Sequence, residues 1–159
     1  MYLFAKLLHV IAVILFMGNI ITGVFWKMHA ERAKDPRSIA EVFDGIIRSD
    51  RWFTIPGTVA IVAAGIWTAN IGGYPILGTG WIFWSIVLFT LSGVAFSIWL
   101  APLQRKIRNL AQAGVESGRF DWDQYHALAR AWDIWGLVSL LTPVGAVVLM
   151  VLKPTLPGL

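Results

Sequence analysis

The sequence predicts an all-α integral membrane protein, an antiparallel bundle of four helices forming a single domain over residues 1–159. Of the 159 residues, 57% are hydrophobic and 14% are charged, and the mean hydropathy is +0.69. A soluble domain carries charge on about a quarter of its residues. Four apolar segments are long enough to cross roughly 30 Å of hydrocarbon as helices. The expected spans are residues 7–26, 52–71, 81–101 and 132–152.

Tryptophans mark the ends of these spans, as the aromatic belts at membrane interfaces do. One expected interface holds Trp26, Trp52, Trp99 and Trp132, and the other holds Trp67, Trp81 and Trp84. The positions of the aromatic residues therefore support the same span ends as the hydropathy.

Basic residues predict how the spans are oriented. The connection between spans one and two holds six of the 13 Lys and Arg residues, and the connection between spans three and four holds five. The middle connection, residues 72–80, holds none. Because cytoplasmic connections are enriched in Lys and Arg, we expect both termini on the outer side of the membrane.

The first connection predicts an amphipathic interfacial helix between spans one and two, over residues 36–48. Asp35 and Pro36 are typical of an N-cap and the first helical position. Apolar residues then recur at helical spacing, at Ile39, Val42, Phe43, Ile46 and Ile47. Charged residues occupy the opposite face, so this helix is expected to lie at the lipid surface. The alternative is a surface for docking a partner.

The third connection predicts where the last two long helices end and begin. Apolar residues continue the third helix past Pro102, and Gly114 and Gly118 interrupt it. Asp121 and Gln124 have the spacing of a capping box. We therefore expect the fourth helix to begin near Trp122, before the bilayer.

Composition and motifs exclude several classes of function. The chain has no cysteine, which removes disulfides, thiolate metal sites and a cysteine nucleophile. It also has no dinucleotide-binding, P-loop, nucleophile-elbow or zinc-protease motif. The net charge is +4, but the basic residues lie beside apolar runs, which indicates the lipid bilayer rather than nucleic acid as the partner.

Ionisable residues in or near the spans are the candidates for chemistry, since they are costly in a membrane. His9, at the outer end of span one, carries an imidazole that can ligate a metal or haem iron. Lys153 ends span four on the same side, so we expect the two residues at one depth. The alternatives are a histidine bonded to a neighbouring helix and a lysine that reaches the lipid headgroups.

Two further polar groups are expected inside or beside the bundle. Asn19 lies at the middle of span one, where its amide needs a partner from another helix. Asp133 lies near Arg130 and Arg51 at the cytoplasmic interface, where these residues are expected to form a structural ion pair or to hold an anionic group.

Three short runs carry a resemblance that covers nearly the whole chain. They are Lys6–Val13 (KLLHVIAV), Asp50–Gly57 (DRWFTIPG) and Val151–Pro154 (VLKP). Together they resemble an uncharacterised family of small bacterial four-span membrane proteins. The same landmarks, in the same order, are more distantly similar to the HemJ type of protoporphyrinogen oxidase and to CopD-type membrane proteins.

The HemJ resemblance implies an inner-membrane oxidoreductase that binds haem b and oxidises a tetrapyrrole. In a bacterial inner membrane, the orientation expected from the basic residues places both termini on the periplasmic side. The resemblance also implies His9 as the haem ligand and metal-binding residue, and Lys153 and Arg51 as catalytic residues. Asn19 is kept with His9 as a candidate cofactor-binding residue, although Met17–Asn19 replaces an aromatic-Gly landmark of that family. The family's histidines on the third span are also missing, because Ser97–Trp99 occupies that stretch.

Three functions follow from these observations. The first is a haem-binding membrane redox protein acting on a tetrapyrrole or quinol. The second is a non-catalytic membrane protein or an accessory subunit of a larger complex. The third is a copper or small-solute carrier by analogy with CopD, for which the Met and His residues show no paired spacing. Small-residue helix faces leave a homo-oligomer open.

Overall fold

A computed structural model describes all 159 residues, and every regular element in it is helical. The α-helices are interrupted by two π-helical segments, η1 and η2. In chain order the elements are α1 (Tyr2–Ala33), α2 (Pro36–Ser49), η1 (Asp50–Thr54), α3 (Ile55–Ile71), α4 (Gly80–Ala95), η2 (Phe96–Leu100), α5 (Ala101–Ser117) and α6 (Trp122–Leu152).

Four long helices are apolar enough to cross a membrane. This confirms the all-α class, and it confirms four candidate spans by length and composition. They are α1, the continuous helix from α2 through α3, the continuous helix from α4 through α5, and α6. The shortest, α6, has 31 residues, or about 46 Å at 1.5 Å per residue. Each helix is therefore longer than the hydrocarbon layer of roughly 30 Å. The expected spans are therefore only the apolar parts of these longer helices.

The two π-helical segments have the same sequence cause. The backbone N–H of Ile55 donates to the carbonyl of Asp50, and that of Ala101 donates to the carbonyl of Phe96. Each donor directly precedes a proline, Pro56 or Pro102. Proline has no N–H, and its ring crowds the carbonyl four residues earlier. A π turn accommodates such a local mismatch without ending the helix.

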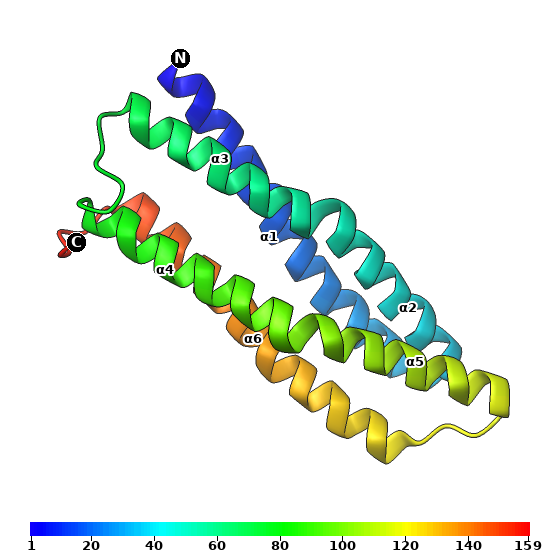
Figure 1. The fold of residues 1–159 in the computed structure, drawn as a ribbon. Helices are drawn as coiled ribbons and strands as arrows, with labels where there is room; N and C mark the ends of the chain where they lie inside the picture. The colour runs from blue at the N-terminus through cyan, green and yellow to red at the C-terminus, as the bar shows by residue number, and fades with distance from the viewer.

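The helices pair in a simple pattern, shown in Figure 1. Helix α1 packs along α3, α4 packs along α6, and α2 packs against α5. Both chain ends lie at one end of the molecule, while the connection between α5 and α6 lies at the other (Figure 1). Hereafter the latter is the α2–α5 end.

The amphipathic helix forms as expected, but its apolar face is buried in protein. Asp35 caps α2 by accepting the N–H of Arg37 at 2.9 Å. Ile39 and Phe43 on α2 are fully buried, in one hydrophobic cluster with Ile107 of α5 and Tyr125 of α6. The stripe expected to face lipid therefore forms the core of the α2–α5 end. The apolar face of α2 packs onto α5 and the start of α6.

The start of α6 matches the capping pattern. Helix α5 ends at Ser117, and the next residue, Gly118, has a left-handed φ of 68° that suits glycine. The side chain of Asp121 then accepts the N–H of Gln124 at 2.9 Å, and α6 begins at Trp122. The expectation that the fourth helix starts before the apolar span is confirmed.

Candidate functional site

A cavity of about 330 Å³ lies between the helices, and all four long helices contribute to its wall. Four aromatic side chains line it: Phe16, Phe89, Phe96 and Trp132. Polar side chains share the wall, among them Asn19, Asp50, Thr54 and Gln104. We call these four residues the polar cluster. Aromatic and polar groups from all four long helices meet at this cavity.

Asp50 is the centre of the polar cluster and is 9% exposed. Its Oδ1 accepts hydrogen bonds from the Thr54 hydroxyl at 2.7 Å and from the Asn19 amide at 3.2 Å. Its Oδ2 accepts one from the Gln104 amide at 2.9 Å. The Asn19 amide also donates to the Thr54 hydroxyl oxygen at 2.9 Å. Every partner of this carboxylate is therefore neutral.

Helix geometry explains why these residues meet. Asp50 and Thr54 are four residues apart at the two ends of η1, a spacing that places side chains on one helix face. Gln104 follows η2 by one turn, in the first turn of α5. Asn19, on α1, completes the cluster from the first span. Both π-helical segments therefore border the same cavity, and π-bulges are frequent at functional sites.

No cation balances the charge of Asp50. The ion pairs of the chain involve Lys27 with Glu31 and Asp133, and Arg48 and Arg108 with Asp44. A buried ion without a counter-charge costs several kcal/mol in a folded protein. A carboxylate has about four acceptor positions, and the cluster fills three of them. One position on Oδ2 remains for an additional donor.

Two residues that line the cavity each have a buried polar atom without a hydrogen-bond partner. The indole N–H of Trp132 and the hydroxyl of Ser139 are buried and make no hydrogen bond, although both residues line the cavity. The Ser92 hydroxyl bonds the Ser139 carbonyl, at 2.8 Å, and leaves the Ser139 side chain unpaired. Buried polar atoms are nearly always bonded, so these two atoms are exceptions, and neither has surface open to the cavity.

His9 lies outside the cavity, against α3. Its Nδ1–H donates to the Ile61 carbonyl at 2.9 Å. The ring also rests on Gly65, where a Cβ atom would lie 3.1 Å from His9 Cε1. This arrangement is the bond to a neighbouring helix that the sequence left open, and it leaves Nε2 without a hydrogen-bond partner.

The other expected site residues are separate from His9. Lys153 caps the C-terminus of α6 with a φ of 47°, and its Nζ lies 5.1 Å from the Trp81 ring centroid and 5.7 Å from that of Tyr74. Arg51 is exposed and makes no hydrogen bond or ion pair. No hydrogen bond or ion pair joins any two of His9, Arg51 and Lys153. Of the four residues proposed from the sequence, only Asn19 lines the cavity.

Asp133 has a different partner from the one expected. Lys27 Nζ lies 2.8 Å from both carboxylate oxygens of Asp133 and 2.8 Å from Glu31 Oε1. The Tyr125 hydroxyl donates to the same Glu31 oxygen at 3.0 Å. The expected pairing of Asp133 with Arg130 or Arg51 is therefore wrong, since α1 brings the buried Lys27 beside α6.

Sequence reasoning missed Asp50, Thr54 and Gln104 as site residues. Asp50 and Thr54 belong to a run used only for the family resemblance, and Asp50 lies just before the expected span. Their spacing of four residues was the available signal. Gln104 lies just past Pro102, in the connection between spans three and four, and nothing in the sequence pairs it with Asp50.

The fold and the site define an all-helical integral membrane protein with four candidate membrane-spanning helices and a polar cavity between them. The family model described as "Predicted integral membrane protein (DUF2269)" matches residues 3–154. The chain therefore belongs to the DUF2269 family, whose function is unknown. No curated protein and no solved structure matches the chain.

Proposed function

We propose that this protein binds a small organic ammonium ion in the membrane, with Asp50 as its counter-ion. The observation that carries the proposal is the buried Asp50 carboxylate, which has three neutral partners, no cation and a cavity beside it. We further propose that the four helices cross the membrane in alternate directions. The α2–α5 end, which holds most Lys and Arg residues, then faces the cytoplasm.

The charge of Asp50 favours a cationic ligand. Away from bulk water, the carboxylate has its lowest free energy when it is paired with a cation or carries a proton. The amides of Asn19 and Gln104 and the hydroxyl of Thr54 orient the carboxylate. An ammonium N–H would then fill the acceptor position left on Oδ2.

The neighbours of Asp50 favour an organic ammonium over a metal ion. Calcium takes six to eight oxygen ligands, whereas Asn19 and Gln104 present N–H groups toward Asp50. The chain has no group of three His, Cys, Asp or Glu residues arranged for a metal. Aromatic rings such as Phe16 and Phe89 line the cavity, and aromatic faces attract organic cations.

The size of the cavity limits the ligand to a small molecule. Pockets for small ligands have volumes of about 300–1,000 Å³, and this cavity of about 330 Å³ lies at the lower end. A compact amine therefore fits the charge of Asp50 and the volume of the cavity.

The test is the thermal unfolding of the detergent-purified protein in rising concentrations of methylammonium chloride. We expect the unfolding temperature to rise and saturate, because a ligand at 100 times its Kd stabilises a protein by about 2.7 kcal/mol. In Asp50→Asn this rise should disappear, since the amide keeps the shape of the side chain without its charge.

Two controls separate binding from a salt effect. Asp123→Asn removes an exposed carboxylate at the start of α6 and should keep the full response. Sodium chloride at equal ionic strength should give no saturable rise. An equal response in Asp50→Asn and Asp123→Asn would refute the proposal, as would no response in the unmodified protein.

A second candidate function is haem binding at His9, favoured by the His9–Ile61 hydrogen bond. Metal-ligating histidines usually donate their other N–H to a carbonyl or carboxylate, which fixes the ring and raises its basicity. His9 has this bond, and Nε2 is its remaining nitrogen. His9 would therefore hold haem iron through Nε2, and a bound haem would supply redox chemistry. Arg51 and Lys153 make no hydrogen bond or ion pair with His9, so they are not part of this proposed haem site.

An absorption spectrum of protein purified after expression with added haem tests this second candidate. Haem ligation by His9 predicts a Soret band that His9→Ala abolishes and that His126→Ala, at the other end of the bundle, retains. A colourless protein, or a band that survives His9→Ala, would rule the site out.

A further inference from the structure

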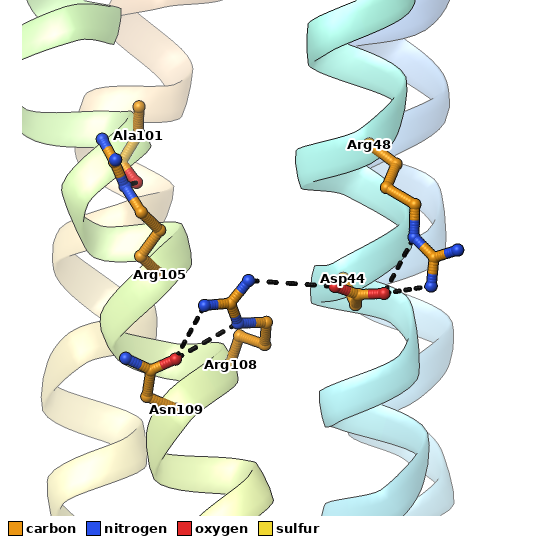
Figure 2. A network of polar contacts seen from close by, with 6 residues as sticks. All are labelled: Asp44, Arg48, Ala101, Arg105, Arg108 and Asn109. Carbon is orange, nitrogen blue, oxygen red and sulfur yellow. Dashed lines mark hydrogen bonds and ion pairs between the residues drawn. The ribbon is translucent and has the colours of Figure 1, made fainter.

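The two helices that contain a π-helical segment meet at one end of the molecule and are apart toward the other. At the α2–α5 end, Arg108 of α5 reaches Asp44 of α2, with 3.8 Å between Nη1 and Oδ1 (Figure 2). Beyond the π-helical segments, no Cα atom of α3 lies within 8 Å of one in α4 or η2. Figure 1 shows α3 and α4 set apart where α2 and α5 lie together. The seam between these two helices is therefore closed beside α2 and α5 and open beside α3 and α4.

The cavity meets the surface of the molecule in this open seam. The exposed residues among those that line the cavity are Ile55, Val59, Gly93 and Ser97, all on α3, α4 or η2. Ile55 is 55% exposed and Val59 is 65% exposed. A Cβ atom at Gly93 would meet no other atom within 4 Å. On α1 and α6, by contrast, every lining residue is buried or half-buried. The cavity therefore opens sideways between α3 and α4, and we call these four residues the side opening.

The side opening faces the hydrocarbon layer, whereas Asp50 lies near the edge of that layer. All residues of the side opening lie within the apolar runs 52–71 and 81–101. Asp50 comes just before Trp52, which is 74% exposed and marks the membrane interface, where tryptophan is enriched. Ile55 and Val59 follow Asp50 on the same continuous helix, at about 7.5 and 13.5 Å for a rise of 1.5 Å per residue. A path therefore runs from the Asp50 carboxylate through the cavity to the lipid chains.

We propose that the ligand of the Asp50 site is an amphiphilic amine with a single alkyl chain. Its ammonium group binds Asp50, and its chain leaves through the side opening into the bilayer. This inference rests on the proposed cation site. An ammonium group stays near the membrane surface because a charge is costly in hydrocarbon, and this is the depth of Asp50. Each CH₂ group that stays in hydrocarbon favours the bound state over water by about fourfold. The cavity of about 330 Å³ then holds the polar end of the molecule.

The test is the displacement of radiolabelled methylammonium by octadecylammonium, with the full chain in phosphatidylcholine nanodiscs. The long chain keeps octadecylammonium in the bilayer, so it reaches Asp50 from the side. We expect it to displace all the methylammonium that the unmodified protein binds. Gly93→Phe fills the side opening. In this variant the affinity for octadecylammonium, relative to that for methylammonium, should fall by about tenfold or more, because forcing a group into occupied space costs this much.

The matched control is Gly18→Phe on α1. Gly18 is exposed, does not line the cavity, and also has no atom within 4 Å of an added Cβ. This variant should keep the affinity ratio of the unmodified protein. All the proteins are compared in the same discs, so the surface charge that octadecylammonium adds acts on each of them equally. Ser97→Phe obstructs the side opening at a second position and should lower the ratio as Gly93→Phe does.

The outcomes separate this inference from the cation site on which it rests. Methylammonium binding that octadecylammonium does not displace would leave the cation site in place and refute the amphiphilic ligand. A ratio that falls equally in Gly93→Phe and Gly18→Phe, or in neither, would refute the side opening. Loss of methylammonium binding in both Gly93→Phe and Ser97→Phe would also overturn the inference, because these positions would then belong to the cation site itself. If the unmodified protein binds no methylammonium, the proposed function fails, and this inference fails with it.

Discussion

Lys27→Met is expected to lower the free energy of unfolding by about 3 kcal/mol, because it removes the shared partner of two carboxylates. Lys27 is 3% exposed and joins Glu31 to Asp133 across α1 and α6. Breaking a buried ion pair by removing one partner costs about 3–5 kcal/mol. The lower end applies because Glu31 and Asp133 are partly exposed. Methionine preserves the volume of the alkyl chain.

Denaturant unfolding in mixed micelles, followed by tryptophan fluorescence, measures this change. The control Lys106→Met removes a lysine from an exposed position on α5 and should change the unfolding free energy by less than about 0.5 kcal/mol. Similar values for Lys27→Met and Lys106→Met would show that the ion pairs across α1 and α6 contribute nothing to stability.

Phe43→Ala is expected to cost about 3–5 kcal/mol, the usual range for removing a buried aromatic side chain. Phe43 is fully buried on α2 and packs edge-on against Trp132, with 5.8 Å between ring centroids. The cost arises from the lost contacts and from the space left between α2, α5 and α6. The same unfolding measurement applies.

A second residue of the apolar stripe tests where α2 lies. Ile47 is half-buried and lies outside the main hydrophobic cluster, so Ile47→Ala should cost much less than Phe43→Ala. If α2 lay on the lipid surface, both side chains would contact lipid in the folded and unfolded states. Small and similar effects of the two substitutions would therefore contradict the packing of α2 against α5 and α6.

The parts of the fold that depend on local chemistry could be predicted from the sequence. Continuous apolar runs have few alternatives to a membrane-spanning helix, which identified all four long helices. Capping also acts within a few residues, so Asp35 and Asp121 gave the starts of α2 and α6. Hydropathy alone could not show how far α1 and α6 continue beyond the apolar runs.

Contacts between distant segments could not be read from the sequence. The partner of Asp133 depends on the rotation of α1 that buries Lys27, and the sequence contains no signal for that rotation. The apolar stripe of α2 is equally suited to lipid and to a helical partner, and only the presence of α5 decides between them. An amphipathic pattern identifies which face is buried, but not what covers it.

The candidate site was only partly predictable for the same reason. Asn19 was singled out because an amide in a span needs a partner, and it bonds Asp50 and Thr54. Asp50 was not singled out, because a carboxylate just before an apolar run usually lies in water. The π turns before Pro56 and Pro102 place Asp50 and Gln104 beside one cavity. The prolines alone did not predict that Asp50 and Gln104 would meet.

Equilibrium binding of radiolabelled methylammonium to the purified protein tests the central claim most directly. If Asp50 is the counter-ion of a cation site, the unmodified protein and Asp123→Asn will each bind one saturable equivalent per chain, and Asp50→Asn will bind none. Binding that is unchanged by Asp50→Asn, or no saturable binding to the unmodified protein, would contradict the claim. The buried carboxylate would then be a structural hydrogen-bond acceptor only.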